Sequence, residues 1–371
     1  MMTGIYIHFP FCIKKCAYCD FVSYENMLSE GERYVAALLL EMKEYRKEKA
    51  DTVYLGGGTP TALSPDLLQK VLDGVHNCFD LAPDAEITIE ANPGTCDTKT
   101  FSALKNAGIN RVSLGVQSFV DEELRLLGRI HTAKDAEIAV SNMRDAGIAN
   151  VSLDLMFSLP SQTKESLRYS LEKALFLAPQ HLSCYSLTVC ENTPLESMVK
   201  KGILTLPDED IDRHFYQLIT ECLAQNGYNR YEISNFALEG KEARHNTKYW
   251  NRTPYIGLGA AAHSFFAGER FENPALLQDY YERVKKGKHP KGTCITKEEA
   301  MAEFVFLGLR KTKDGISRKA FYDCFQTNFN GLYGEIVKKL TNLQLLADDG
   351  DRLCLTDRGI DISNAVLAEF L

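Results

Sequence analysis

Long apolar segments are missing from this sequence of 371 residues, and no run approaches the length of a membrane-spanning helix. The start of the chain has neither the charged region nor the apolar core of a secretory signal peptide. Positively charged residues are also outnumbered by negatively charged ones, with 42 Lys and Arg against 50 Asp and Glu. That balance argues against a general binder of nucleic acids or anionic membranes. We therefore expect a cytoplasmic protein with no integral membrane segment and no nucleic-acid partner.

A disulfide framework is missing too, because the eleven cysteines are an odd number scattered along a long chain. Three of them, Cys12, Cys16 and Cys19, nevertheless stand together at the spacing C-x3-C-x2-C. Thiolates are soft ligands, so three so close in sequence can converge on one metal centre. A structural zinc site normally closes with four protein ligands, and a cubane iron–sulfur cluster usually takes four cysteines. Three cysteines would leave one iron of such a cluster open, and the alternative is three unrelated free thiols.

Short β-prone runs alternate with helical segments through the first half of the chain. One strand directly precedes Cys12, and the others are expected at residues 52–55, 86–90, 111–116, 151–156 and 181–187. The expected helical segments are residues 29–49, 65–78, 99–107, 121–146 and 164–177. This alternation implies parallel βα units with right-handed crossovers. Because a closed barrel needs eight units, we predict an α/β fold with a partial (β/α)6 TIM-like barrel whose open side another segment covers.

Residues suited to chemistry recur where these strands end, which is where barrels of this kind carry their sites. The three cysteines follow the first strand and a run of three glycines, residues 56–58, follows the second. Glu90 ends the third strand and Gln117 follows the fourth. The glycine run is either a plain tight turn or a place where a ligand approaches the backbone closely. It is not a phosphate-binding loop, because the motifs G-x4-G-K-[ST] and G-x-G-x-x-G are both absent.

The cysteine spacing resembles the signature of the radical S-adenosylmethionine (radical SAM) superfamily. The resemblance implies a [4Fe–4S] cluster on Cys12, Cys16 and Cys19, with S-adenosylmethionine chelating the open iron through its amino and carboxylate groups. Over nearly the whole chain, the sequence resembles the oxygen-independent coproporphyrinogen III oxidase family and its close relatives. The segments that carry this resemblance are residues 6–12, 56–60, 90–93, 115–119 and 126–131.

Carried over position by position, the resemblance also implies a set of residues that bind S-adenosylmethionine. They are Tyr6 and Tyr18 on its flanks, Gly57, Gly58 and Thr59 at its methionine end, and Glu90, Gln117, Arg129 and Asp154 at its ribose, carboxylate and amino groups. A sulfonium zwitterion has to be oriented by polar, charge-complementary groups, and the planar fork of an arginine suits a carboxylate. Each polar residue alone would be explained as ordinary polarity at a strand end. Their placement on successive strands favours one site.

Two departures separate this chain from the oxidases of that family. Those oxidases carry another cysteine two residues after the third cluster cysteine, where this chain has Phe21, and they have a longer segment before the cluster. Both features resemble instead the sister group of radical SAM haem chaperones, whose H-N-x-x-Y-W motif matches residues 245–250. The resemblance makes His245, Tyr249 and Trp250 a candidate haem site, since histidine is a common ligand of haem iron. The alternative is a buried histidine with an aromatic pair that supports the fold.

The last part of the chain changes character. Residues 283–291 are basic and are interpreted as a solvated linker, with a haem propionate or an acidic partner as a less favoured contact. Helices are expected at residues 297–310, 317–325 and 332–343, followed by a hairpin at 345–356 and a last helix from about Asp357. This order resembles a mainly helical winged-helix module, but residues 296–371 hold ten Lys and Arg against twelve Asp and Glu. We therefore expect a structural cover or a partner-docking module, and domains at residues 1–235, 236–295 and 296–371.

Three hypotheses follow from these observations. The first is a radical SAM haem chaperone that binds a [4Fe–4S] cluster, S-adenosylmethionine and haem and delivers haem to acceptor proteins such as respiratory enzymes. The second is an oxygen-independent coproporphyrinogen III oxidase, which decarboxylates propionate side chains by radical chemistry; Phe21 argues against it. In either case, an electron donor such as flavodoxin is needed if S-adenosylmethionine is cleaved. The third is a structural zinc protein that uses the three cysteines and His8, and it leaves the polar strand ends unexplained.

Overall fold

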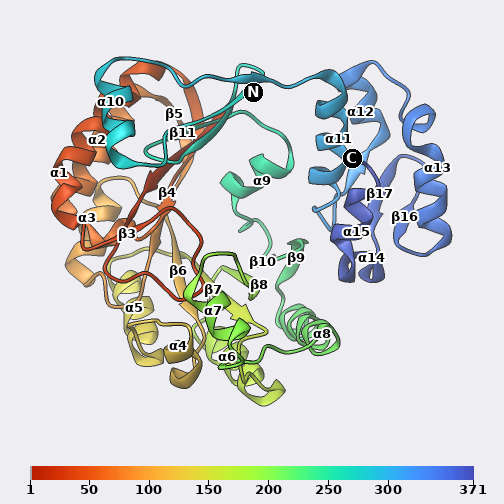
Figure 1. Cartoon of the computed structure of the whole chain (residues 1–371), viewed down its shortest axis with the longest axis horizontal. Helices are drawn as coiled ribbons and strands as arrows, with labels where there is room; N and C mark the ends of the chain where they lie inside the picture. Colours follow the sequence, from red (N-terminus) through yellow and green to blue (C-terminus); the bar gives the residue numbers. More distant parts are fainter. Residues whose placement is uncertain (1) are drawn as a thin grey trace.

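Six parallel strands form the centre of the computed structural model, which describes residues 2–371. In order across the sheet they are β1 (Thr3–Phe9), β4 (Lys49–Gly57), β5 (Asp80–Ala91), β6 (Arg111–Gln117), β7 (Asn150–Phe157) and β8 (His181–Ser186). Their outer face is covered by α1 (Gly31–Met42), α2 (Pro65–Cys78), α3 (Thr98–Asn106), α4 (Asp121–Leu126), α5 (Ala133–Asp145) and α6 (Lys164–Phe176) (Figure 1). The predicted partial (β/α)6 barrel is confirmed.

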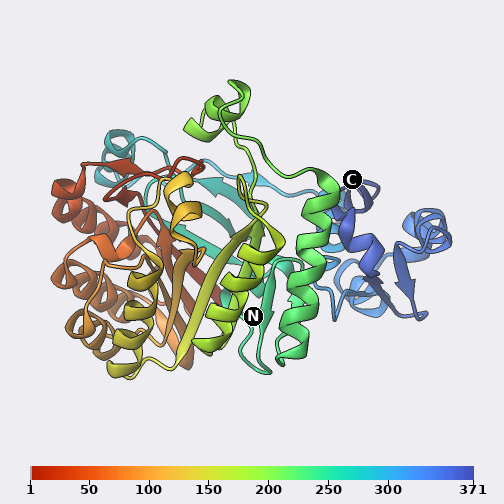
Figure 2. The same cartoon turned by 90° about the horizontal axis from the view of Figure 1, so that it is seen from below.

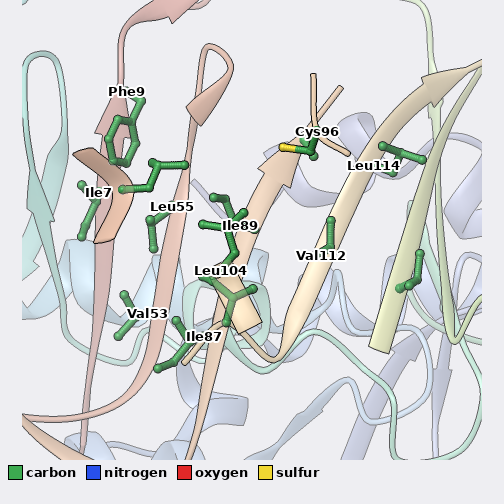
Figure 3. Close-up of a cluster of buried hydrophobic side chains, with 14 of the residues drawn as sticks. Ile7, Phe9, Val53, Leu55, Ile87, Ile89, Cys96, Leu104, Val112 and Leu114 are labelled. Carbon is green, nitrogen blue, oxygen red and sulfur yellow. The ribbon is translucent and has the colours of Figure 1, made fainter. Parts of the chain in front are cut away.

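The strands of the barrel alternate between apolar residues that face the helices and polar residues that face the interior. Ile87 and Ile89 of β5 belong to the hydrophobic core between the sheet and its helices, and so do Val112 and Leu114 of β6 (Figure 3). Successive side chains of a strand point to opposite faces. Burial of the apolar face against the helices therefore fixes which residues turn toward the barrel interior.

Further strands extend the sheet on both sides, to twelve in all. Beside β1 lie β11 (Tyr255–Leu258), β12 (His263–Phe266), β13 (Glu269–Glu272) and β14 (Thr293–Cys294), and beside β8 lie β10 (Asn235–Ala237) and β9 (Asn229–Glu232). A short sheet of β2 (Phe11–Cys12) and β3 (Tyr24–Glu25) frames the cysteine loop. The remaining helices of this part are α7 (Pro194–Lys200), α8 (Glu209–Gln225), α9 (Arg244–Trp250) and α10 (Leu277–Lys285). The predicted cover of the open side is thus made largely of added strands.

Two helical predictions were wrong in detail. The segment expected to be helical from 29 to 49 ends earlier, because the chain takes a positive φ of 69° at Lys47 and enters β4 at Lys49. The expected helical region 121–146 is interrupted between α4 and α5. Gly128, with φ of 74°, allows that break, and it lies close to the backbone of Ala17 in the cysteine loop. The break has a functional consequence, since it places Arg129 beside the cysteines.

The middle of the chain holds a tight turn and one prediction that was wrong. Residues 255–264 form β11, a turn and β12, which pairs with β11 in the antiparallel sense. Gly259 makes this turn possible, because its φ is 97° and a side chain there would come within 2.7 Å of the carbonyl oxygen of His8. The basic segment 283–291 is not a solvated linker at its start, because Arg283 belongs to α10 and is buried against acidic residues of the barrel.

The last part of the chain has a hydrophobic core of its own. Its elements are α11 (Lys297–Gly308), β15 (Ile316–Ser317), α12 (Arg318–Phe325), α13 (Phe329–Asn342), β16 (Leu346–Asp348), β17 (Arg352–Leu355), α14 (Asp357–Asp361) and α15 (Ser363–Ala368). The helix–strand–helix–helix–hairpin order is that of a winged-helix module, as predicted. The long helix α8 lies between the barrel and this module (Figure 2), and Tyr216 of α8 contacts its core.

Candidate active site of the barrel

The three motif cysteines line one wall of a cavity of about 390 Å³ at the carboxyl ends of the strands. Cys12 is buried, Cys16 and Cys19 are half-buried, and all three thiols are free. The loop between them is fixed by the backbone N–H of Ala17, which donates to the carbonyl of Leu127 at 3.0 Å. The cysteines that the sequence places together are therefore together in space, on a loop held by the barrel.

Hydrogen-bond donors point at two of these sulfur atoms. The hydroxyl of Thr59 lies 3.6 Å from Sγ of Cys12, and Nη1 of Arg129 lies 3.3 Å from Sγ of Cys16. Donors of this kind stabilise thiolates, which are the ligand form of cysteine. Burial meanwhile raises the pKa of Cys12 and of Cys19, so bound metal would have to displace their protons. This donor set fits an iron–sulfur cluster.

A zinc site made from the three cysteines and His8 does not fit. Both ring nitrogens of His8 are engaged, with Nε2 2.8 Å from the carbonyl oxygen of Val22 and Nδ1 2.9 Å from the hydroxyl of Tyr6. No three His, Cys, Asp or Glu side chains within residues 2–371 converge as a single metal ion would need. A multinuclear cluster spreads its ligands more widely.

The glycine run lies directly beside the cysteine loop. The backbone N–H of Gly58 donates to the carbonyl oxygen of Phe9 at 2.8 Å. The backbone N–H of Thr59 donates to the carbonyl oxygen of Phe11, also at 2.8 Å. A side chain on Gly58 would come within 2.6 Å of the Phe11 carbonyl oxygen. Glycine is therefore required for close contact between β4 and the loop. Gly57, Gly58 and Thr59 also line the cavity, so the two interpretations of this run, turn and ligand contact, are compatible.

The four polar residues expected to bind S-adenosylmethionine all line the same cavity: Glu90, Gln117, Arg129 and Asp154. Arg129 donates to the side-chain oxygen of Asn92 and to the carbonyl of Gly115, both at 2.6 Å, which fixes its guanidinium beside Cys16. The carboxylate of Asp154 accepts hydrogen bonds from the hydroxyl of Ser113 at 3.0 Å. Such preorganised charges orient a bound ligand at little entropic cost.

Glu90 is a buried carboxylate whose acidity its surroundings change. It accepts hydrogen bonds from the hydroxyl of Tyr54 at 2.8 Å and from the backbone N–H of Gly57 at 2.9 Å. Burial raises the pKa of Glu90 to about 7, against the opposing effect of those two hydrogen bonds. The charge of this side chain therefore changes near neutral pH.

The two predicted flanking tyrosines differ in position. Tyr18 lines the cavity between the cysteines. Tyr6 lies behind the cavity wall, where its ring is 6.2 Å from that of Tyr54 and its hydroxyl contacts His8. Tyr6 can therefore support Tyr54 but does not itself line the cavity.

The predicted haem residues lie outside this cavity. Both ring nitrogens of His245 are in hydrogen bonds. Nδ1 lies 2.9 Å from the hydroxyl of Thr52, and Nε2 lies 2.9 Å from the hydroxyl of Tyr249. Trp250 faces the C-terminal module instead, and the guanidinium of Arg310 stacks on its indole ring at 4.6 Å. Of this motif, only Asn246 lines the cavity. The arrangement favours the alternative of a buried histidine that supports the fold.

Several cavity residues escaped the sequence-based prediction. They are inward-facing residues of the strands and of α9, among them Tyr54, Asn92, Arg111, Ser113, Ser183, Tyr185 and Asn246. The signal that could have found the strand residues is the two-residue period of each strand. Glu90 and Asp154 were expected to face the ligand, and this period places residues two positions away from them, or opposite them on neighbouring strands, on the same face.

Within residues 2–371, no helix is both long enough and apolar enough to cross a membrane. A sequence model of the radical SAM superfamily matches residues 6–174, and a model named HemN C-terminal domain matches residues 295–362. The solved structure of coproporphyrinogen III oxidase (HemN) from Escherichia coli, described as a radical SAM enzyme, has a TM-score of 0.86 and 23% identity. The match covers 100% of this chain and 90% of the solved chain. At that identity the similarity establishes the fold.

Curated relatives match the chain along its whole length. The protein named heme chaperone HemW of Lactococcus lactis is 37% identical over 369 residues, which cover 100% of this chain and 97% of the relative. The heme chaperone HemW of Bacillus subtilis is 37% identical over 377 residues, with coverage of 100% and 99%. The chain therefore belongs to the radical SAM superfamily and, within it, to the HemW family.

Proposed function

We propose that this protein is a radical SAM haem chaperone, which binds a [4Fe–4S] cluster, S-adenosylmethionine and haem and delivers haem to acceptor proteins. The observation that carries the haem assignment is the full-length similarity to two proteins named heme chaperone HemW. The cofactor assignment is supported by one cavity that brings the three cysteines, the glycine run and four charged or polar residues together. When bound, the cluster would supply an open iron that S-adenosylmethionine can chelate.

The chain's own residues have distinct tasks in this proposal. Cys12, Cys16 and Cys19 hold the cluster, and the guanidinium of Arg129 beside Cys16 balances negative charge there. Glu90 and Asp154 face the cavity as acceptors for the ammonium and hydroxyl groups of S-adenosylmethionine. The acceptors of haem would be proteins such as respiratory enzymes, in the cytoplasm or at its boundary, and flavodoxin would donate electrons if S-adenosylmethionine is cleaved.

A haem titration tests the proposal. The purified full-length chain, with its cluster reconstituted under anaerobic conditions, is mixed with increasing haem, and the Soret band is recorded. Binding predicts a shifted Soret band that saturates near one haem per chain, followed by transfer of that haem to an apo-acceptor. A spectrum equal to that of free haem at stoichiometric concentration would refute the chaperone function.

Coproporphyrinogen III oxidase activity is the second candidate, and the similarity of fold to HemN favours considering it. The position of its additional cysteine is taken here by Phe21, which lines the mouth of the cavity with 63% of its surface exposed. Incubation with coproporphyrinogen III, a reductant and S-adenosylmethionine decides between the two functions. We expect no vinyl product, and its formation would reverse the ranking.

The haem ligand itself can be tested at His245. Because both ring nitrogens of His245 already have partners, iron ligation would require two hydrogen bonds to break. We expect the His245→Ala variant to lose about 2–4 kcal/mol of unfolding free energy while the coordination bands of bound haem stay those of the unaltered chain. Loss of those bands with unchanged stability would instead make His245 the ligand.

The affinity for S-adenosylmethionine should depend on pH through Glu90. The pKa of Glu90 is raised to about 7, and its facing groups are Tyr54, Asp154 and Arg111. Only the ionised carboxylate pairs with a cationic ligand, so the affinity should fall about tenfold between pH 8 and pH 6. Calorimetric titration at several pH values measures this. The Glu90→Gln variant should bind more weakly at pH 8 and lose the pH dependence; equal wild-type affinities at pH 6 and 8 would contradict the role.

We also propose the three-part organisation at residues 1–235, 236–295 and 296–371. The last boundary is supported by the separate hydrophobic core that begins with Met301 and by the family match that begins at residue 295. The middle part contains α9, which covers the barrel interior, and the strands beside β1. The C-terminal module would then act as a cover or docking surface.

A further inference from the structure

Arg111 is a cavity residue that none of the proposed roles uses. It begins β6, its side chain is only 2% exposed, and it lines the same cavity as the cysteines. The other two arginines discussed above have partners. Arg129 bonds to Asn92 and to Gly115, and Arg283 forms ion pairs with acidic residues of α1 and the turn after it.

The guanidinium of Arg111 has no such partner. Within residues 2–371 it forms no ion pair and no side-chain hydrogen bond, and its Nε is buried without an acceptor. Glu90 and Asp154 are near enough for its charge to lower their pKa, but their oxygens already accept hydrogen bonds from Tyr54 and Ser113. The Nε–H group of Arg111 is therefore a buried donor without a partner, on a residue that lines the cavity.

A guanidinium in the interior that donates no hydrogen bond is costly, because the charge loses its hydration. Such a residue is usually paired, or else its partner is a ligand. The planar fork of arginine matches the two oxygens of a carboxylate, and that pairing is stronger than a neutral hydrogen bond. Ser113 and Ser183 line the cavity with it, and their hydroxyls can add contacts to the same group.

Arg111 also lies far from the cysteine end of the cavity. It is the first residue of β6 and Gln117 is the last, so the two ends are separated by roughly 20 Å along the strand at about 3.3 Å per residue. Arg129 is the guanidinium at the cysteine end, where Nη1 is 3.3 Å from Cys16. The cavity thus has two cationic positions, at opposite ends, and Asn246 of α9 lines it as well.

We propose that Arg111 binds a propionate carboxylate of haem at the deep end of the barrel cavity. The methionyl carboxylate of S-adenosylmethionine is expected at the open iron of the cluster, at the cysteine end. The inference deepens the proposed function and rests on it.

Two pairs of ligands that differ in their carboxylates test the proposal on the full-length chain with its cluster reconstituted. One pair is haem and haem dimethyl ester, in which both propionates are esterified; the other, which serves as a control, is S-adenosylmethionine and its decarboxylated analogue. Dissociation constants are measured for the wild type, Arg111→Met and Arg111→Lys. Arg125→Met is the matched control, because Arg125 is an exposed arginine of α4 whose ion pair with Glu122 lies at the surface.

We expect Arg111→Met to weaken binding of haem about tenfold to a hundredfold, with haem dimethyl ester nearly unaffected. Arg111→Lys should lose less, because it keeps the charge but not the fork. A loss confined to haem supports the proposal, and a loss confined to S-adenosylmethionine overturns it.

Equal losses for both members of each pair, or no loss in either, overturn the proposal. A lowered melting temperature of Arg111→Met with unchanged ligand ratios assigns Arg111 a structural role and overturns it as well. If Arg111→Met does not fold, Arg111→Lys decides by the same ratios. Wild-type protein that fails to bind haem refutes the proposed function, whereas wild-type binding that Arg111→Met leaves unchanged refutes only the role of Arg111.

Discussion

Replacing Cys12, Cys16 or Cys19 with serine should leave the purified protein almost without iron and labile sulfide. A serine hydroxyl stays protonated near neutral pH and is a hard ligand, whereas iron–sulfur clusters are held by thiolates. With one of three protein ligands removed, the two that remain cannot hold a cubane. We expect at least a tenfold fall in iron and sulfide per chain after anaerobic reconstitution, and loss of the broad visible absorption of the cluster.

Cys190 provides a matched control for this experiment, because it lines the same cavity but lies outside the motif. The Cys190→Ser variant should therefore retain iron and sulfide at the level of the unaltered chain. Circular dichroism of each variant checks that the fold is intact. Full iron content in the Cys16→Ser variant, or an equal loss in Cys190→Ser, would contradict the assignment of the three ligands.

Much of the fold followed from local patterns in the sequence. The helix at 65–78 was predicted at both ends, because Ser64 caps it and Pro65 occupies its first turn. The six strands were predicted from short β-prone runs between helical segments, and their apolar residues pack beneath the outer helices. The break after α4 was missed, because it depends on Gly128 meeting the cysteine loop, a contact distant in sequence.

The candidate site was predicted in its chemistry but less well in its extent. The cysteines and Glu90 were expected because motif and strand end coincide. Arg111 was not, because it begins its strand and only the alternation of β6 turns it inward. Tyr6 was expected to contact the ligand, but its contact with Tyr54 places it behind the cavity wall. A motif identifies residue types, whereas the layer in which each side chain lies depends on tertiary packing.

The basic segment that begins at Arg283 was misjudged for a related reason. Its composition suggested solvent exposure, yet Arg283 pairs with Glu41, whose side chain is 1% exposed, and with Glu44 at 2.9 Å. Glu41 also accepts hydrogen bonds from the backbone N–H of Gly259 at 2.8 Å and from the hydroxyl of Tyr280 at 2.7 Å. Charge composition cannot reveal a counter-charge that lies more than two hundred positions away in the sequence.

This buried pair carries the largest stability effect that we expect. The Arg283→Met variant leaves the carboxylate of Glu41 buried without its cation, which should lower the unfolding free energy by about 3–5 kcal/mol in urea denaturation. Burial already raises the pKa of Glu41, and Arg283 opposes that rise. Without Arg283 the pKa of Glu41 should rise further. The loss of unfolding free energy in the variant is therefore present at pH 8, and it becomes smaller as the pH falls and Glu41 is protonated.

The double variant Glu41→Gln with Arg283→Met separates charge from packing. Glutamine removes the buried charge and can still accept the hydrogen bonds of Gly259 and Tyr280, so the double variant should recover more than half of the loss at pH 8. The pH dependence should disappear with the carboxyl group. If the double variant is no more stable than Arg283→Met, the loss comes from the packing of α10 against α1, and the ion pair is not what stabilises this side of the barrel.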